Sequence, residues 1–402
     1  MSRIYLSSKS TIMKKRPFKK RGVDYPIVDG APTLSGKYYH SPEIFKEETE
    51  KIFYKFWLYA CRAEEIPGIG DYKTVQVVDE SIILVRDKSS EIRALFNVCR
   101  HRGTQLCTTS GGTFKSKSIQ CPYHAWTYSL DGKLMAAPLM QEGGGFRKED
   151  CGLHLATVHV WEGFVFINLD EKPIAFEKQM TALIGRFADW KMEELRIAHH
   201  IRYNLNCNWK LILQNYQECY HCPGVHPLLS ERTPFQSAQH DVNAGAVIGG
   251  FMEITQKGGS MTMNGEPAAP PVCKVSGDDL QRVYYYSVYP SLLLTPHPDF
   301  VMFHHITPCG PEKIINDCYW LFRPEVIADA QAQKGIQSAV EFWDLTNRQD
   351  WQVCEQMQVG TRSRRFKQGF YSGREDILYQ LDRELLKALG HDDPYPAKDG
   401  NS

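Results

Sequence analysis

Two pairs of residues with metal-binding side chains lie in the first third of the chain. Cys99 and His101 form a Cys-x-His pair, and Cys121 and His124 form a Cys-x-x-His pair after a gap of 19 residues. Two thiolates and two imidazoles suit one tetrahedral zinc ion, but they equally suit an iron-sulfur cluster whose cysteines bind one iron and whose histidines bind the other. The ligand types leave both metals open. Cys107, between the pairs, is interpreted as a small buried hydrophobic residue.

Two further histidines, His221 and His226, lie five residues apart. On an unbroken helix this spacing turns the two side chains to different faces, because neighbours on one face are three or four residues apart. Pro223 and Gly224 supply a break, so a helix that ends near His221 lets the following turn bring His226 back towards it. The pair then supplies two ligands of a two-histidine-one-carboxylate iron site.

Asp350 is the candidate third ligand of that site. A helix through this segment would put Trp343, Cys354 and Met357 on the same face as Asp350 and point all four inward. A buried carboxylate needs a partner. Both a metal ion and an ordinary structural hydrogen bond meet that need, and the residues alone favour the hydrogen bond.

The surroundings of the first two pairs resemble the Rieske proteins. Cys121-Pro122-Tyr123-His124 is followed by Trp126, and both pairs stand among short strand-like runs. The gap between the pairs is slightly longer than the commonest family spacing. The resemblance implies a 2Fe-2S cluster on Cys99, His101, Cys121 and His124, with a reduction potential of roughly −150 to +300 mV.

The second motif looks like the catalytic domain of Rieske oxygenase α subunits, and the likeness covers residues 36–389. The matching segments are 208–227, 342–344 and 347–351. The likeness implies that His221, His226 and Asp350 bind a mononuclear iron.

The same likeness gives Glu218 a role. The acidic residue at its position in the family bridges a neighbouring subunit's cluster to the iron. A glutamate there, rather than aspartate, is similar to the choline, carnitine and glycine-betaine monooxygenase branch. Gln214 departs from the acid often seen at its position.

Local patterns predict the elements that carry these ligands. Ser41 and Pro42 have the types that begin a helix. Strand-like runs are expected at 72–78, 81–85, 92–98, 163–168, 283–295 and 314–322, and helices at 340–357 and 375–389. The segment 230–279, rich in glycine, serine and proline, is expected to be a mobile lid or insertion.

These elements predict an α+β protein with two domains. We expect a basic flexible leader at 1–35, an all-β Rieske 2Fe-2S domain with its N-terminal helix at 36–170, and a catalytic mononuclear iron domain at 171–402. The catalytic domain is expected to resemble the helix-grip fold, which is built on a curved antiparallel sheet.

The composition excludes several classes of function. Lysine plus arginine and aspartate plus glutamate number 47 each, so no global field favours nucleic acid. No apolar run approaches the ~20 residues that span a bilayer. The 12 cysteines lack the spacing of a secreted scaffold and are expected to be reduced. We therefore expect a cytoplasmic protein, or an organellar one if the basic leader is a transit peptide.

Other candidate residues carry less weight. The segment 245–250 lacks the dinucleotide fingerprint, so the reductase is expected to be a separate chain. His304 and His305 are adjacent, so at most one faces a site from a strand, and both are interpreted as structural. Aromatic residues at 284–286, 289 and 320 could form the wall of a substrate cavity. Aromatic runs in strands, however, usually belong to the hydrophobic core.

We therefore expect the oxygenase component of a Rieske system. It would take electrons from a separate NAD(P)H-dependent reductase or ferredoxin, form a homotrimer, and hydroxylate a small N-methyl quaternary ammonium compound with O2. The alternatives are an aromatic ring-hydroxylating dioxygenase α subunit and, outside enzymes, a Rieske electron carrier. A carrier needs only about a hundred residues.

Overall fold

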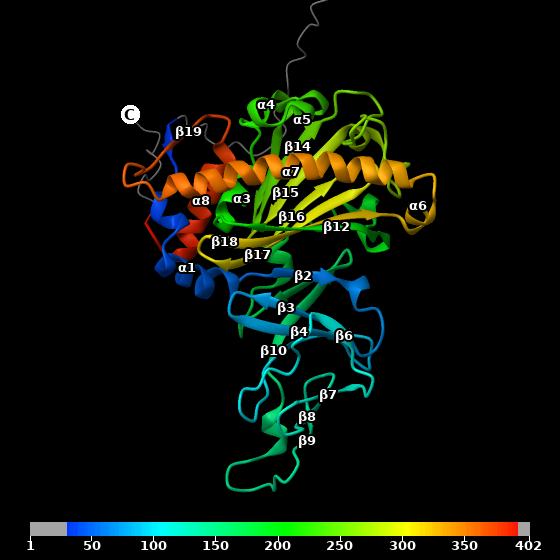
Figure 1. Ribbon diagram of the computed structural model, residues 1–402, viewed down its shortest axis with the longest axis vertical. Helices are drawn as coiled ribbons and strands as arrows, with labels where there is room; N and C mark the ends of the chain where they lie inside the picture. The colour runs from blue at the N-terminus through cyan, green and yellow to red at the C-terminus, as the bar shows by residue number, and fades with distance from the viewer. Residues whose placement is uncertain (1–29, 393–402) are drawn as a thin grey trace, which may run out of the picture.

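The computed structural model describes residues 30–392, which form two seven-stranded sheets, a small three-stranded sheet and a two-stranded sheet (Figure 1). One seven-stranded sheet, with most of the helices, lies at one end of the molecule. The second lies below it, and the three-stranded sheet forms the opposite tip. Most of the expected basic leader lies outside the described residues.

The N-terminal seven-stranded sheet is antiparallel, in the order β2-β11-β10-β5-β4-β3-β6. Its strands are β2 (Leu58–Arg62), β3 (Asp71–Val77), β4 (Glu80–Arg86), β5 (Ile92–Phe96), β6 (Gly111–Thr113), β10 (Leu155–Trp161) and β11 (Phe164–Asn168). The tip consists of β7 (Ser118–Gln120), β8 (Thr127–Ser129) and β9 (Leu134–Ala136). The strand-like runs predicted in this half agree with these strands to within about two residues.

The second large sheet is the curved antiparallel sheet of a catalytic domain, in the order β12-β18-β17-β16-β15-β14-β13. Its strands are β12 (Arg196–Leu205), β13 (Gln239–Ala244), β14 (Val247–Glu253), β15 (Arg282–Val288), β16 (Leu292–Pro296), β17 (Val301–Gly310) and β18 (Lys313–Phe322). The helices are α1 (Pro42–Glu48), α2 (Phe176–Gln179), α3 (Trp209–Tyr216), α4 (Cys222–Val225), α5 (Pro227–Arg232), α6 (Pro324–Ala328), α7 (Gln333–Thr361) and α8 (Asp376–Leu389). The expected α+β class is confirmed.

The long helix α7 crosses one face of this sheet, and the other face packs on the N-terminal sheet (Figure 1). Strand alternation decides which side chains go where. Tyr284 and Tyr286 belong to the same apolar cluster as Phe164 of the N-terminal sheet. Tyr285, between them, points to the opposite face, under α7, where it packs against Trp343 at a ring distance of 6.3 Å.

The start of the described chain contacts the C-terminal half of the molecule as well as the N-terminal sheet. Strand β1 (Ala31–Pro32) pairs with β19 (Phe370–Tyr371), so the described end of the expected leader is ordered in a sheet. Glu48 at the end of α1 accepts a hydrogen bond from Lys210 Nζ at 2.5 Å, and both side chains are buried. Separating a buried ion pair leaves an uncompensated charge, which costs free energy. The pair therefore stabilises the packing of α1 on α3. The expected domain bounds, with this helix grouped in residues 36–170, stay a prediction.

Three local expectations were wrong. The segment 230–279 is not a single mobile lid, because it contains β13 and β14 of the central sheet. The run 283–295 is two strands joined by a turn rather than one. Helix α7 buries Trp343 and Cys354 as expected, but Met357 is 43% exposed because the apolar face of the helix has turned away by that point.

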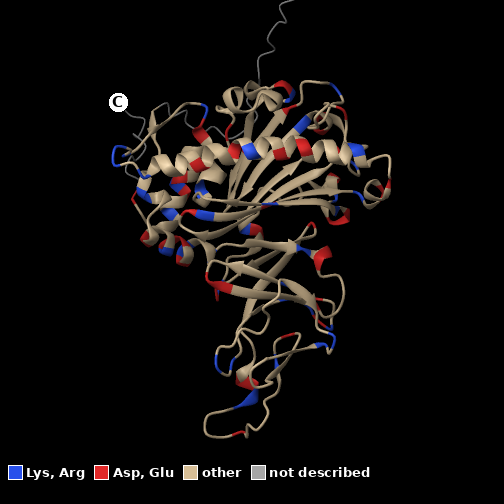
Figure 2. Ribbon diagram, viewed as in Figure 1, with Lys and Arg blue, Asp and Glu red and all other residues tan. Residues whose placement is uncertain are grey.

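Charged side chains of both signs occur along α7, whereas the central strands carry few (Figure 2). Helix α7 therefore presents no stretch of positive charge alone that would bind a polyanion. No helix in residues 30–392 combines the length and apolar character that crossing a membrane requires.

Candidate metal centres

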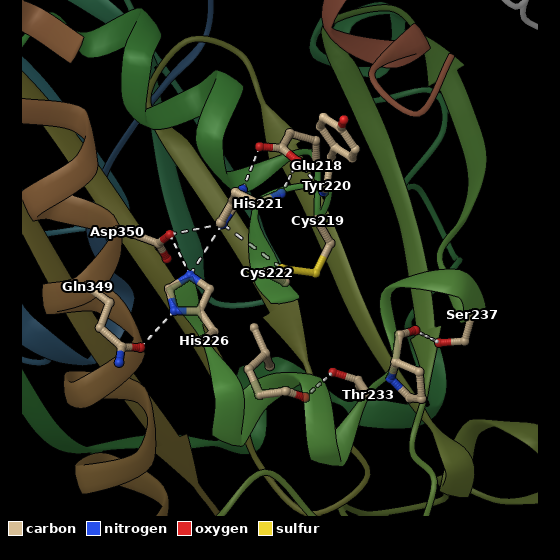
Figure 3. Close-up of a disulfide and its surroundings, with 12 residues drawn as sticks. Glu218, Cys219, Tyr220, His221, Cys222, His226, Thr233, Ser237, Gln349 and Asp350 are labelled. Carbon is tan, nitrogen blue, oxygen red and sulfur yellow. Dashed lines mark hydrogen bonds and ion pairs between the residues drawn. A yellow bond between two sulfur atoms is a disulfide. The ribbon is translucent and has the colours of Figure 1, made fainter. Parts of the chain in front are cut away.

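His221, His226 and Asp350 meet in one place, from three different parts of the fold (Figure 3). The two Nε2 atoms are 3.2 Å apart. Asp350 Oδ1 lies 2.8 Å from Nε2 of His226 and 3.2 Å from Nε2 of His221. Within the described part of the chain, this is the only group of three or more histidine, cysteine or acidic side chains whose ligand atoms all lie within 4.8 Å of one another.

The spacing of these three atoms fits a metal with ligands on one octahedral face. Three ligands at right angles, each about 2.1 Å from a metal, lie about 3.0 Å apart, whereas a tetrahedral arrangement would separate them by about 3.4 Å. The observed separations of 2.8 to 3.2 Å match the first arrangement. The residues therefore fit a two-histidine-one-carboxylate iron site.

The other ring nitrogen of each histidine is held by a separate acceptor. Glu218 Oε1 lies 2.5 Å from Nδ1 of His221, and Gln349 Oε1 lies 2.7 Å from Nδ1 of His226. An oxygen acceptor at Nδ1 keeps the proton there, so each Nε2 turns its lone pair towards the shared point. Gln349 was not found from the sequence, because an amide has no ligand-type signature of its own.

The electrostatics of the site favour a cation. Although burial lowers it, hydrogen bonds with Asp350 and Glu218 raise the pKa of His221 to about 10. Despite burial, the same contacts with His221 and His226 lower the pKa of Asp350. Positive charge is thus stabilised between these side chains, as a metal-binding site requires.

Local backbone structure explains how two histidines five residues apart converge. Helix α3 ends at Tyr216, five residues earlier than the expected end near His221. His221 instead precedes the single turn α4, and His226 stands between α4 and α5 with φ −123° and ψ 72°. The predicted break at Pro223-Gly224 is thus one short turn, and Pro227 begins the next helix.

A disulfide lies beside this site. Cys219 and Cys222 are bonded to each other on either side of Tyr220 and His221 (Figure 3). The expectation that all cysteines are reduced was therefore wrong for this pair. The other ten cysteines are free. The disulfide closes a short loop that contains Tyr220 and His221 and begins directly after Glu218, and neither sulfur is needed as a ligand.

The second constellation lies on two similar loops at the tip. Gly103 N–H donates to Cys99 O at 3.0 Å, and Ala125 N–H donates to Cys121 O at 3.1 Å. Gly103 and Ala125 both adopt positive φ, 75° and 58°, which lets each loop fold tightly around its cysteine. Cys99 is 2% exposed, and its thiol contacts the Tyr128 hydroxyl at 3.2 Å.

The histidines of these loops lie further out than the cysteines. The rings of His101 and His124 are 4.8 Å apart, and His124 is exposed. The thiols of Cys99 and Cys121 interact with each other. The two pairs do not converge on one point as the ligands of a single zinc ion would. A cysteine pair inside and a histidine pair outside instead fit the two irons of a Rieske cluster. Cys107 is buried, as expected.

A cavity of about 600 Å³ adjoins the three-residue site. Its aromatic wall consists of Tyr216, Tyr220, Phe235, Tyr285, Trp343 and Trp351. Phe251 also borders the cavity, but its ring packs against Tyr284 on the other face of the sheet. Of the two adjacent histidines, His304 lines the cavity, whereas His305 packs against Tyr59 on the other face at a ring distance of 4.9 Å. The interpretation of both histidines as structural residues missed the position of His304 in the cavity wall. Likewise Tyr285 lines the cavity, while its neighbours Tyr284 and Tyr286 are core residues.

Comparisons with known proteins match both halves of the chain. Residues 56–159 match the Rieske [2Fe-2S] domain, and residues 192–390 match the ring hydroxylating alpha subunit catalytic domain. The chain is 30% identical to the glycine betaine monooxygenase oxygenase subunit of Chromohalobacter salexigens over 376 residues, which cover 85% of this chain and 82% of that protein.

Solved structures agree in fold. The chain is similar to a quaternary ammonium Rieske monooxygenase described for carnitine oxidation by gut microbiota and for inter-subunit electron transfer. The TM-score is 0.77 at 27% identity, with 90% of this chain and 96% of the other covered. The complex of the monooxygenase CntA with γ-butyrobetaine gives a TM-score of 0.74 at 28% identity, with 90% and 97% covered.

Proposed function

Since this chain belongs to the Rieske non-haem iron oxygenases, we propose that it hydroxylates a small N-methyl quaternary ammonium compound. As an oxidoreductase of this family it has a 2Fe-2S cluster and a mononuclear iron. An electron carrier without a catalytic domain is thereby excluded. The proposed substrate class follows the relatives named for glycine betaine and carnitine, and the γ-butyrobetaine complex.

The observation that carries the proposal is the cavity beside His221, His226 and Asp350. A quaternary ammonium ion has no N–H to donate, so aromatic faces and nearby negative charge must recognise it. Six aromatic side chains line the cavity, and its volume of about 600 Å³ is typical of small-molecule sites. Each cation–π contact contributes about 0.5 to 2 kcal/mol when desolvated.

We assign the cluster to Cys99, His101, Cys121 and His124, and the mononuclear iron to His221, His226 and Asp350. When bound, the cluster supplies single electrons and the iron supplies open coordination positions at which O2 is reduced.

The protein's own side chains orient these ligands. Glu218 and Gln349 keep the protons of the two iron-site histidines on Nδ1, 2.5 and 2.7 Å from their acceptor oxygens.

Electrons are proposed to pass between subunits of a homotrimer. In one chain the tip with β7 and β8, which flank Cys121 and His124, is at one end of the molecule, while α4 and α7 lie towards the other (Figure 1). A head-to-tail ring is the symmetric way to bring one chain's cluster to its neighbour's iron.

Glu218 suits the final step of this path. Its Oε1 contacts His221 Nδ1 and its Oε2 accepts from the backbone N–H groups of Tyr220 and His221, which hold the carboxylate beside Tyr220, a side chain that is 58% exposed. The path proposed here has a histidine of the neighbouring cluster donate to a remaining lone pair of this carboxylate. The reductase that loads the cluster is proposed to be a separate chain, and a cytoplasmic location stays a prediction.

The reaction balances with two electrons. One oxygen atom of O2 enters a C–H bond of the substrate, and the other leaves as water with two protons. If the bond belongs to an N-methyl group, the hydroxymethyl product releases formaldehyde, and a tertiary amine remains. Hydroxylation of another carbon would leave the three methyl groups in place.

Substrate-dependent oxygen uptake tests the proposal. We expect the purified protein, supplied with a surrogate reductase and NADH, to consume O2 with glycine betaine, γ-butyrobetaine, L-carnitine or choline, and to label the product from 18O2. Oxygen uptake and ring-diol formation with aromatic hydrocarbons alone would replace the proposal with the ring-hydroxylating alternative.

A further inference from the structure

The acidic and basic side chains that line the cavity differ in whether they already have a partner within the protein. Its carboxylates all have cationic or N–H partners: Glu218 contacts His221, Asp350 contacts both iron-site histidines, and Asp376 Oδ1 lies 3.2 Å from Nδ1 of His240. No carboxylate of the described cavity wall is therefore left to pair with a substrate cation, which must rely on the aromatic faces.

Arg374, unlike these carboxylates, has no partner of opposite charge among the described residues. It is the one arginine or lysine among the described residues that line the cavity. Within the part of the chain that the structure describes, its guanidinium makes no ion pair, and its contact is with the ring of Phe235, 5.7 Å from the ring centroid. Its backbone N–H donates to Ser372 Oγ at 3.3 Å, which stabilises the turn between β19 and α8.

We propose that Arg374 binds the carboxylate of a zwitterionic substrate, so that the protein selects betaines over cations such as choline. The inference rests on the proposed function and narrows its substrate class. A guanidinium is a planar fork of donors that matches a carboxylate with two parallel hydrogen bonds. The contact with the Phe235 ring limits the positions of the guanidinium before the substrate arrives, which reduces the entropy cost of binding.

His240 does not offer the same anchor. Its Nδ1 is engaged by Asp376, so the pair presents little net positive charge to an anion. Arg374 stands two residues before Asp376, at the start of α8, and Phe235 belongs to a short turn that follows α5. The carboxylate end of the substrate would thus lie between this turn and α8, and its ammonium end among the aromatic side chains.

Binding to the holoenzyme under anaerobic conditions tests the inference without turnover. The probes are glycine betaine, γ-butyrobetaine and L-carnitine, each measured beside its own methyl ester, which keeps the ammonium group and removes the negative charge. Isothermal titration gives the ratio of the dissociation constant of the ester to that of the acid. We expect at least one acid to bind about 10- to 100-fold more tightly than its ester, as for a charge-assisted hydrogen bond.

Three variants decide whether Arg374 causes the preference. Arg374→Met should bring the ratio to within about threefold of one, and Arg374→Lys, a point charge without the fork, should give an intermediate ratio. Arg364→Met changes an exposed arginine outside the cavity wall and should keep the wild-type ratio.

A wild-type ratio in Arg374→Met, or no preference for any acid in the wild type, would overturn the inference while leaving a quaternary ammonium substrate in place. Failure of all six probes and of choline to bind the wild type would instead overturn the proposed function and the inference together.

Discussion

Gln349 accepts a hydrogen bond from Nδ1–H of His226 across 2.7 Å. The next residue on α7, Asp350, approaches the opposite nitrogen of the same ring, with Oδ1 2.8 Å from Nε2. One turn of helix therefore both supplies a proposed iron ligand and fixes the tautomer of another.

Gln349→Leu tests this coupling. Loss of the acceptor frees the ring to rotate and to protonate Nε2, so we expect iron(II) affinity to fall about 10- to 100-fold, as for other partners of metal-bound histidines. Competition with a chelator measures the affinity, and the visible spectrum of the cluster should not change. Gln352→Leu, at an exposed position of the same helix, is the matched control. Equal iron affinity in Gln349→Leu and the wild type would show that Gln349 does not orient His226.

Glu218→Gln tests the electron path. The amide keeps the size of the side chain but removes the negative charge that stabilises the Nδ1–H of His221 and a donor from the neighbouring cluster. Both metal centres should load, while reoxidation of the reduced cluster by O2 in the presence of substrate slows by at least about tenfold, the effect of about 1.4 kcal/mol on a barrier. Stopped-flow absorbance measures it, with the exposed Glu231→Gln as control. An unchanged rate would remove Glu218 from the path.

Mixed trimers test transfer between subunits. A His101→Ala chain lacks a cluster ligand, and an Asp350→Ala chain lacks an iron ligand, so each is expected to be inactive alone. In a trimer that contains both, an intact cluster of one chain can face an intact iron site of its neighbour, and partial activity should return. Separate affinity tags isolate such trimers, and wild-type trimers that carry the same tags give the reference rate. If purified mixed trimers stay inactive, transfer runs within one chain.

Residue type and spacing predicted the parts of the site that carry ligand chemistry. Cys99, His101, His221 and His226 were singled out in that way, because thiols and imidazoles at such spacings are typical metal ligands. The residues alone favoured a structural hydrogen bond for Asp350, so its prediction as an iron ligand depended on the family resemblance.

What the sequence missed depends on tertiary contacts. Gln349 and Arg374 are ordinary surface types until the fold turns them towards the site. The face of β15 that carries Tyr285 could not be assigned, since a run of three tyrosines has no alternation to reveal which one faces α7. The disulfide between Cys219 and Cys222 needs a loop that brings the two sulfurs together, and the predicted continuous helix hid that loop.

Asp382 on α8 predicts a dependence of stability on pH. Its carboxylate is buried, accepting from Gln214 Nε2 at 2.7 Å and from the Tyr371 hydroxyl at 2.8 Å, and burial raises its pKa to about 7. Between about pH 4 and 7 the folded protein thus holds a proton that the unfolded chain has released. This group's contribution to stability is complete below about pH 4, falls by at most about 1.4 kcal/mol per pH unit as the pH rises, and is constant above about pH 7.

Asp382→Asn removes that dependence. The melting temperature of the variant minus that of the wild type should rise from pH 5 to pH 7 and then level off, as followed by scanning calorimetry. Asp79→Asn, at an exposed turn, should show no such trend. A difference that is constant with pH would mean that Asp382 is ionised throughout in the folded protein.

The central claim is that two separate constellations on one chain hold two different iron centres. Quantitative metal and acid-labile sulfide analysis, carried out on the wild type and on His221→Ala in parallel, tests it most directly. We expect about three irons and two sulfides per chain in the wild type, and about two irons and two sulfides in His221→Ala, because the two sites share no ligand. Stoichiometric zinc without sulfide in the wild type, or loss of iron and sulfide together in His221→Ala, would contradict the account.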